Sequence, residues 1–462
     1  MFDQSVYKQR RKHLKLQIKS GYILLIGNDE SPMNAAENCY PFRQDSSFLY
    51  FIGPDIPGLT AVIDIDHDRT ALFGTDRTMD EIIWTGTQPS ITRLAAQSGI
   101  EHTGTPEALV TFLARQKTQN RKIHFIPPYR AETLVRLETL TGISHREIIK
   151  NASVDLIRAV VRLRSVKTDA EVDQIEGAIN LSHQIYDHAL KTVRPGMYEQ
   201  QLAGQLTGIV NAHGRQVSFP TILTIHGETL HQRHQRHRMG ENNLLLLDSG
   251  TQSTEYYASD ITRTFSIGGR FTPRQKAIYE VVLKAQAAGI ENTRPGRRYK
   301  DAHLATAESM VCDLKALGLM RGDVKEAVHN GAHALFFPHG LGHMLGLDVH
   351  DMESLGENFV GYDDQTRRSD QFGLSSLRMA RELKPGFVVT AEPGIYFIPM
   401  LIKQWKAENR CAEFIDYSEV EKYREFGGIR IEDDVLVTQN GCRVLSKNIP
   451  KAVDQIESSL SL

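Results

Sequence analysis

Two similar stretches decide the fold of this chain, TDAEVDQIEGAINLSHQIYDHALKTVRPG at residues 168–196 and TPRQKAIYEVVLKAQAAGIENTRPG at residues 272–296. Each begins with a helix-start signal, a capping box in the first and proline in the first turn of the second. Apolar residues at three- to four-residue spacing predict an amphipathic helix in the first stretch. Both stretches end at Arg-Pro-Gly before a second helical segment. Chance similarity is the alternative, but the pattern favours a duplicated unit with pseudo-two-fold symmetry.

The remaining sequence predicts a separate domain ahead of this repeat. Residues 1–152 begin with a basic, amphipathic helical segment and alternate helix-like segments with short apolar runs, which lie at 22–26, 48–52, 61–65 and 122–126. That alternation is typical of an α/β domain. We therefore expect a two-domain α/β protein, with an N-terminal domain at 1–152 and an α+β domain at 153–462 that contains the duplication. A structural, gating or oligomeric role is expected for the first domain, because it contains no group of catalytic residue types.

The overall composition excludes several classes of partner. The formal net charge is −2, so electrostatics predict neither a nucleic acid nor an anionic membrane as partner. The four cysteines show no paired spacing, and no apolar run is long enough to span a bilayer. The first residues lack the apolar core of a signal peptide. A cytoplasmic location is therefore expected.

Five potential metal ligands lie in the second half of the chain, in segments that otherwise read as buried strands or Gly/Pro-punctuated loops. They are Asp248, Asp260, His343, Glu392 and Glu432. Acidic residues are rarely buried unless they are paired or bind a metal. Taken singly, each could be a turn, cap or surface acid, but that explanation does not account for all five. Divalent cations would neutralise the mutual repulsion of four buried carboxylates.

The positions of these residues suggest how they could meet. Asp248 closes an apolar run and Asp260 begins another after a turn, so a hairpin can bring the two together. Arg430, Glu432 and Asp434 alternate, so they are expected on one face of a strand. Oxygen-rich ligation with one imidazole favours manganese, cobalt, zinc or iron over copper. Two such ions, about 3.5–4 Å apart, can activate a water for hydrolysis.

The histidines need a separate interpretation. His339 and His343 are four residues apart, but two glycines lie between them and no glutamate follows His339, which excludes a helical zincin motif. We expect a loop or strand that presents one ligand, with His339 and His350 facing the substrate or supporting the ligands. The histidine-rich tract at 226–238 reads as a solvated loop, with surface metal binding as the alternative. His231 within this tract is a separate case.

The ordered motifs DSG, SDITRT, HGLGHMLGLDVHD, AEPGIYF and GGIRIEDD resemble those of the pita-bread (creatinase-like) metallopeptidases, most closely aminopeptidase P and prolidase. The resemblance extends over nearly the whole chain, because YPFRQDSSFLYF at 40–51 and IWTG at 83–86 resemble the N-terminal domain of the same family. The combination of catalytic motifs is highly specific, and the N-terminal motifs are moderately so.

The resemblance implies a role for each ligand. Asp248 would chelate one metal, Asp260 and Glu432 would bridge two, and His343 and Glu392 would complete the second. Glu392 would also carry a proton from the attacking water to the leaving nitrogen. The metals implied are two divalent ions, manganese first, with cobalt or zinc as alternatives.

Further residues match substrate-contacting or supporting positions of the family. His231, His339 and His350 match histidines that polarise the scissile carbonyl and stabilise the oxyanion. Arg430 matches an arginine that holds the bridging glutamate. Arg378 matches a prolidase arginine that pairs with a dipeptide carboxylate, with a surface role as the alternative. Trp84 matches an aromatic that reaches a neighbouring subunit's site in tetrameric relatives, with a half-buried core indole as the alternative.

The implied substrate is a peptide with proline in second position. Proline nitrogen carries no N–H, so this bond needs a dedicated enzyme. An Xaa-Pro aminopeptidase is the leading expectation, a prolidase (Xaa-Pro dipeptidase) is the alternative, and a non-catalytic binding protein on the same fold is a remote one. A homo-oligomer, dimer or tetramer, is also expected. Two departures stand out: Asp248 and Asp260 are twelve residues apart where relatives usually have eleven, and the residues after His231 differ from the usual pattern.

Overall fold

The computed structural model describes residues 1–118 and 121–460. These residues form two compact units, one of residues 1–164 with 354–359, the other of residues 165–353 and those from 360 onward. Helix α8 (Val154–Ser165) occupies the residues between the domain boundary expected after residue 152 and the observed division. The boundary itself stays a prediction.

The N-terminal unit is built on a mixed five-stranded sheet in the order β6-β5-β4-β1-β7. The interior strand β1 (Tyr22–Ile26) is buried along its whole length and pairs antiparallel with β4 (Thr60–Asp64) and parallel with β7 (Ile123–His124). Strand β5 (Arg69–Phe73) lies between β4 and β6 (His102–Gly104), so β6 and β7 are the edge strands. A separate hairpin consists of β2 (Pro32–Ala35) and β3 (Asn38–Cys39). The remaining helices are α1 (Gln4–Lys15), α2 (Ser46–Phe51), α3 (Met79–Thr85), α4 (Ile91–Gln97), α5 (Pro106–Thr118), α6 (Ala131–Thr141) and α7 (His145–Asn151).

Three of the four apolar runs of this unit form strands, and the run at 48–52 does not. It belongs to helix α2, whose N-cap Asp45 accepts a hydrogen bond of 2.8 Å from the backbone N–H of Phe48. All six residues of α2 are buried. Because a helix buried on every side has no polar face, its apolar run cannot be distinguished from a buried strand by periodicity.

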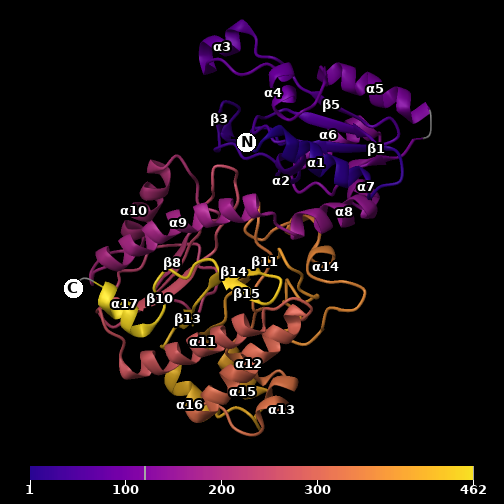
Figure 1. Ribbon diagram of the computed structural model, residues 1–462. Coiled ribbons are helices and arrows are strands. Elements are labelled where there is room, and N and C mark those ends of the chain that lie inside the picture. The colour runs from indigo at the N-terminus through magenta and orange to yellow at the C-terminus, as the bar shows by residue number, and fades with distance from the viewer. Residues whose placement is uncertain (119–120, 461–462) are drawn as a thin grey trace. The chain divides into compact units, whose positions relative to one another are not determined.

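The second unit contains the two helix pairs that the sequence predicts. The first pair is α9 (Asp169–Thr192) and α10 (Glu199–Ala212), and the second is α11 (Pro273–Asn292) and α12 (Tyr299–Ala316). Both Arg-Pro-Gly segments turn the chain through a left-handed glycine, with φ of 94° at Gly196 and 79° at Gly296. In Figure 1 the strands of this unit lie between the two pairs.

Each helix pair is followed by strands of a three-stranded antiparallel sheet. The first sheet has the order β10-β9-β8, with β8 (Ile222–Thr224), β9 (Leu244–Asp248) and β10 (Thr262–Ser266). The second has the order β11-β14-β15, with β11 (Val388–Ala391), β14 (Asp433–Val437) and β15 (Cys442–Val444). A two-stranded ribbon of β12 (Gly394–Tyr396) and β13 (Gly428–Arg430) lies next to them in sequence. This repeated arrangement agrees with the predicted duplication.

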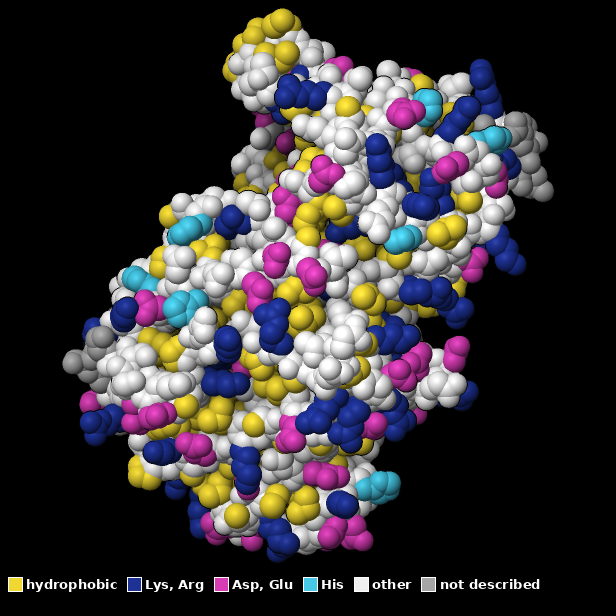
Figure 2. Space-filling view, in the orientation of Figure 1, with side chains coloured by type: hydrophobic (Ala, Val, Ile, Leu, Met, Phe, Trp, Pro, Cys, Tyr) yellow, Lys and Arg dark blue, Asp and Glu magenta, His cyan; other side chains and the backbone are white. Residues whose placement is uncertain are grey.

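Shorter helices complete the description of the chain after α12. They are α13 (Val324–His329), η1 (Ala332–Leu335), η2 (Glu353–Leu355), α14 (Glu357–Val360), α15 (Pro399–Ala407), α16 (Tyr417–Val420), η3 (Glu421–Tyr423) and α17 (Val453–Ser459). Among the described residues, no helix combines the length and the apolar character needed to cross a bilayer. On the face drawn in Figure 2, basic and acidic side chains are interspersed, in keeping with the small net charge.

Candidate metal centre and active site

The hairpin of β9 and β10 brings the two aspartates to one edge of the first sheet. Asp248 is the last residue of β9 and pairs with Thr262, the first residue of β10, so Asp260 precedes the strand by two residues. The backbone N–H of Asp260 donates to the Asp434 carboxylate at 3.1 Å. Both aspartates are buried. The hairpin therefore forms as the sequence predicts.

His343 is presented by a loop that runs against β11. Its N–H donates to Thr390 Oγ1 at 3.0 Å, and the Thr390 N–H donates to the His343 carbonyl at 3.0 Å. Gly342 permits this approach, because a Cβ there would lie 2.0 Å from the Thr390 carbonyl oxygen. The imidazole Nδ1 lies 3.0 Å from the Met344 carbonyl and donates to it, so Nε2 carries the lone pair.

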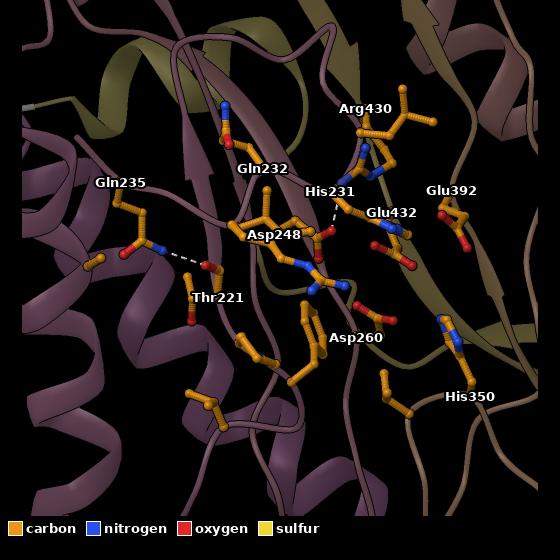
Figure 3. A pocket seen from close by; sticks show the side chains of 18 of the residues that line it. Thr221, His231, Gln232, Gln235, Asp248, Asp260, His350, Glu392, Arg430 and Glu432 are labelled. Carbon is orange, nitrogen blue, oxygen red and sulfur yellow. Dashed lines mark hydrogen bonds and ion pairs between the residues drawn. The ribbon is translucent and has the colours of Figure 1, made fainter. Parts of the chain in front are cut away.

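The lone pair of His343 points at two carboxylates. Its Nε2 lies 3.3 Å from Asp260 Oδ2 and 3.5 Å from Glu392 Oε1. Glu392 directly follows β11, and Glu432 lies between β13 and β14. Asp260, His343 and Glu432 each offer one ligand atom, and these atoms all lie within 4.8 Å of one another. Figure 3 shows the carboxylates of Asp248, Asp260, Glu392 and Glu432 converging on the same space.

The predicted continuous strand at 430–434 is divided in the structure. Arg430 ends β13 and Asp433 begins β14, with Glu432 between them. Glu432 nevertheless stays in register with the first sheet, because its N–H donates to the Thr262 carbonyl at 3.1 Å. The side chains of Arg430, Glu432 and Asp434 all contact groups of the aspartate hairpin. Their shared face is therefore preserved across the break.

The carboxylates of this cluster are electrostatically frustrated without a cation. Burial, followed by the charges of Glu432 and Asp248, raises the pKa of Asp260 well above its usual range. Burial and the Glu392 carboxylate raise the pKa of Glu432 in the same way. Burial also raises the pKa of Glu392 to about 7, although Arg430 opposes the shift. Repulsion of this kind is what divalent cations relieve.

Unpartnered oxygens show where such cations would find ligands. Asp248 Oδ1 and Asp260 Oδ1 are buried and have no hydrogen-bond partner among the described residues. Burial, followed by His350, lowers the pKa of His343, which favours the neutral imidazole that metals bind. Oxygen donors with one imidazole suit borderline or hard divalent ions. The donor set therefore fits the predicted metals.

Arg430 is held by groups on both sides of the cluster. Its Nη2 donates to Asp248 Oδ2 at 2.6 Å, and its Nη1 donates to Tyr396 Oη at 2.9 Å. Its Nε donates to Thr262 Oγ1 at 3.2 Å, and the Thr262 hydroxyl donates to Glu432 Oε2 at 2.7 Å. Thr262 thus links Arg430 to Glu432, whereas the direct ion pair of Arg430 is with Asp248. Sequence reasoning named neither Thr262 nor Tyr396, although both lie inside the quoted motifs.

The three predicted substrate-facing histidines all line one cavity of about 1210 Å³. His339 already uses both ring nitrogens, Nδ1 with the Gly340 carbonyl and Nε2 with Tyr396 Oη, each at 2.9 Å. Burial lowers its pKa to about 3, so the ring is neutral. Its Nε2 therefore accepts a hydrogen bond from the Tyr396 hydroxyl, and neither ring nitrogen is left to donate to a substrate.

His350 and His231 are arranged differently from His339. The His350 ring packs edge-on against His343, with centroids 4.1 Å apart, and its Nδ1 lies 2.6 Å from Glu353 Oε2. Burial, followed by Arg430, lowers the pKa of His231. His231 belongs to the loop at 226–238, which has no regular secondary structure, as expected. Figure 3 shows His231 close to Asp248 and Arg430.

The base of that loop is fixed by a buried acid. Glu199, at the start of α10, accepts hydrogen bonds from the Ile225 N–H at 2.9 Å and from the His237 N–H at 3.0 Å. Its Oε2 also lies 3.0 Å from His237 Nδ1, and the His237 ring contacts His226 with centroids 4.5 Å apart. These two histidines therefore hold the loop in place, and His234 is exposed, as a solvated loop requires.

The two remaining predicted residues lie in different units. Arg378 lines the cavity and forms an ion pair with Glu353. Trp84 lies on α3 of the N-terminal unit and is 85% exposed, so the alternative of a half-buried core indole is wrong. Met79 and Ile83 of the same helix are each 70% exposed, and Figure 2 shows the hydrophobic side chains gathered there.

Comparisons with known proteins show which family the chain resembles. The model of metallopeptidase family M24 matches residues 173–439, and that of the aminopeptidase P N-terminal domain matches residues 7–124. The Xaa-Pro dipeptidase of Homo sapiens is 31% identical, covering 99% of this chain and 92% of its own. The Xaa-Pro aminopeptidase of Escherichia coli (strain K12) is also 31% identical, covering 98% and 96%.

Solved structures show the same fold. The aminopeptidase PepP of Pseudomonas aeruginosa superposes with a TM-score of 0.81 at 28% identity, covering 99% of this chain and 98% of its own. A zinc-substituted Escherichia coli aminopeptidase P in complex with product has a TM-score of 0.80 at 27% identity, with the same coverage. The predicted pita-bread architecture is thereby confirmed. The chain belongs to metallopeptidase family M24.

Proposed function

We propose that this protein is a dinuclear metal-dependent Xaa-Pro aminopeptidase, which hydrolyses the bond between an N-terminal residue and a following proline. The observation that carries the proposal is the convergence of Asp248, Asp260, His343, Glu392 and Glu432 at one end of a large cavity. Relatives named Xaa-Pro aminopeptidase and Xaa-Pro dipeptidase support the substrate class. A pocket that fits the pyrrolidine ring would select proline, whose nitrogen lacks an N–H.

The five ligands divide between two cation positions. Asp248 would bind the first cation, and His343 and Glu392 would bind the second. Asp260 and Glu432 would bind both. The ions supply Lewis-acid polarisation of the carbonyl and activation of water. We propose manganese as the physiological metal, with cobalt or zinc as alternatives that the same donors accept.

The side chains around the ligands would handle protons and orientation. Glu392 would move a proton from water to the proline nitrogen. His231 would donate to the scissile carbonyl and the developing oxyanion, and His350 would face the same groups of the substrate. Arg430 would keep Asp248 oriented by its 2.6 Å ion pair and reach Glu432 through Thr262. His339 would position Arg430 through Tyr396, because both of its ring nitrogens are engaged.

A prolidase activity is the second candidate, and Arg378 is the observation that favours it. This guanidinium lines the cavity and could bind the carboxylate of an Xaa-Pro dipeptide. A role in binding alone is disfavoured, because the complete ligand set is present. We further propose a cytoplasmic homo-oligomer in which the exposed Trp84 contacts another subunit.

Hydrolysis of matched peptides tests the proposal. The protein loaded with manganese should cleave Xaa-Pro-Yaa peptides to release Xaa, and chelation should abolish the activity. Glu392→Gln should reduce kcat by at least about a hundredfold, since proton transfer contributes 10²–10⁴-fold. Glu425→Gln, which changes an exposed glutamate in the same way, is the matched control. Absence of cleavage by the loaded wild-type protein, or full activity of Glu392→Gln, contradicts the proposal.

A further inference from the structure

Glu353 connects two side chains of the cavity wall without belonging to the metal centre. It is the first residue of η2, and its Oε2 lies 2.6 Å from His350 Nδ1. Its Oε1 accepts from Arg378 Nη1 in an ion pair. His350 and Arg378 both line the cavity, and Glu353 contacts both of them without being a lining residue itself.

The Glu353 carboxylate is ionised at neutral pH. The hydrogen bond from His350 is the main reason that its pKa is lowered to about 2, and the charge of Arg378 adds to the effect. A negative charge therefore lies against the Arg378 guanidinium that lines the cavity.

Arg378 is the cavity cation best placed to distinguish peptide lengths. Arg430 also lines the cavity, but its guanidinium is committed to Asp248, Tyr396 and Thr262. Arg233 lines it from the exposed loop at 226–238. An Xaa-Pro dipeptide carries a carboxylate on its proline, whereas a longer peptide has a neutral amide there. A guanidinium already neutralised by a protein carboxylate attracts a second carboxylate less strongly.

The geometry points to Glu353 as a specificity-determining residue, which disfavours substrates with a free proline carboxylate and so biases the site toward peptides longer than a dipeptide. This inference rests on the proposed function, because it concerns the same peptide-cleaving site. Glu353 also positions His350, since a Nδ1–H held by the carboxylate leaves Nε2 toward the cavity. The positioning role affects both kinds of substrate equally, whereas the charge affects only the carboxylate-bearing kind.

A matched substrate pair isolates the charge effect. We would measure kcat/KM for an Xaa-Pro dipeptide and for its C-terminal amide with the manganese-loaded wild type and Glu353→Gln. Glutamine keeps the shape and the hydrogen-bond acceptor but removes the charge. The ratio of kcat/KM for acid over amide should rise roughly tenfold in Glu353→Gln, mainly through a lower KM for the acid, as expected for removing one nearby charge at an effective dielectric of about 20. Glu425→Gln should leave the ratio unchanged.

Second variants keep the test decisive. Adding Arg378→Gln to Glu353→Gln should return the ratio to near its wild-type value, because the cation whose charge Glu353 offsets is then absent. If Glu353→Gln does not fold, Glu353→Ala should show the same rise. Cleavage of both substrates with an unchanged or lowered ratio overturns the inference and leaves the proposed function intact. No cleavage of Xaa-Pro or longer peptides by the wild type overturns the proposed function itself.

Discussion

Replacing Thr262 with valine tests whether a residue that hydrogen-bonds to a predicted metal ligand supports metal binding. The Thr262 hydroxyl donates to Glu432 Oε2 at 2.7 Å and accepts from Arg430 Nε at 3.2 Å, and the residue is fully buried. Valine keeps the shape of the side chain but leaves both charged partners without that contact. Hydrogen bonds to charged groups contribute about 1.5–3 kcal/mol each, so the loss of two should lower the free energy of unfolding by about 3–6 kcal/mol.

The effect on metal binding distinguishes this role from simple stabilisation. Loss of a second-sphere partner costs about 10–100-fold in metal affinity, so Mn²⁺ titration of metal-free Thr262→Val should show a fall in that range by calorimetry. Thr264→Val is the matched control, because within the described part of the chain its hydroxyl hydrogen-bonds only to the backbone of Arg430, at 3.0 and 3.2 Å. We expect the control to lose stability but to keep its metal affinity within about threefold. Equal metal affinity in Thr262→Val and wild type would refute the reasoning.

Three further predictions follow from other parts of the second unit. Glu199→Ala removes the acceptor of two backbone N–H groups at the base of the His231 loop, at a cost of about 1–3 kcal/mol per unpaired group. We therefore expect kcat/KM to fall by about tenfold and Tm to decrease. Unchanged peptide turnover would exclude the anchoring role. Gly342→Ala places a Cβ 2.0 Å from a β11 carbonyl, which should destabilise the protein by about 1–3 kcal/mol and weaken Mn²⁺ binding, and calorimetry with wild-type affinity would contradict it. Burial lowers the pKa of His333 to about 4, so as pH falls from about 6.5 toward 4 the unfolded chain takes up a proton that the folded protein does not, and stability should fall by about 3 kcal/mol through this residue. Urea unfolding across that window should show a shallower pH dependence for His333→Gln, and an identical slope would count against the prediction.

The sequence was sufficient to predict the repeated architecture and to single out the acidic residues and the histidine that the folded chain brings together. Both depend on local pattern: carboxylates that interrupt apolar runs need a reason for burial, and helix caps with Arg-Pro-Gly ends mark element boundaries. The hairpin that joins Asp248 and Asp260 could be predicted for the same reason, because only a turn separates its strands. The run at 48–52 could not be assigned correctly, since burial on all sides removes the periodic signal that distinguishes helix from strand.

Only the tertiary structure decided which side chains hydrogen-bond to the predicted metal-binding residues. Arg430 contacts Asp248 across 182 positions in the chain, and Thr262 contacts Glu432 across 170. No local pattern encodes such partners, because they follow from how β10, β13 and β14 approach one another. The same holds for His339, whose ring nitrogens are engaged by its own loop and by Tyr396. Residue type and spacing determine which chemistry the chain can perform, whereas hydrogen-bond partners are set by the packing of separate strands and loops.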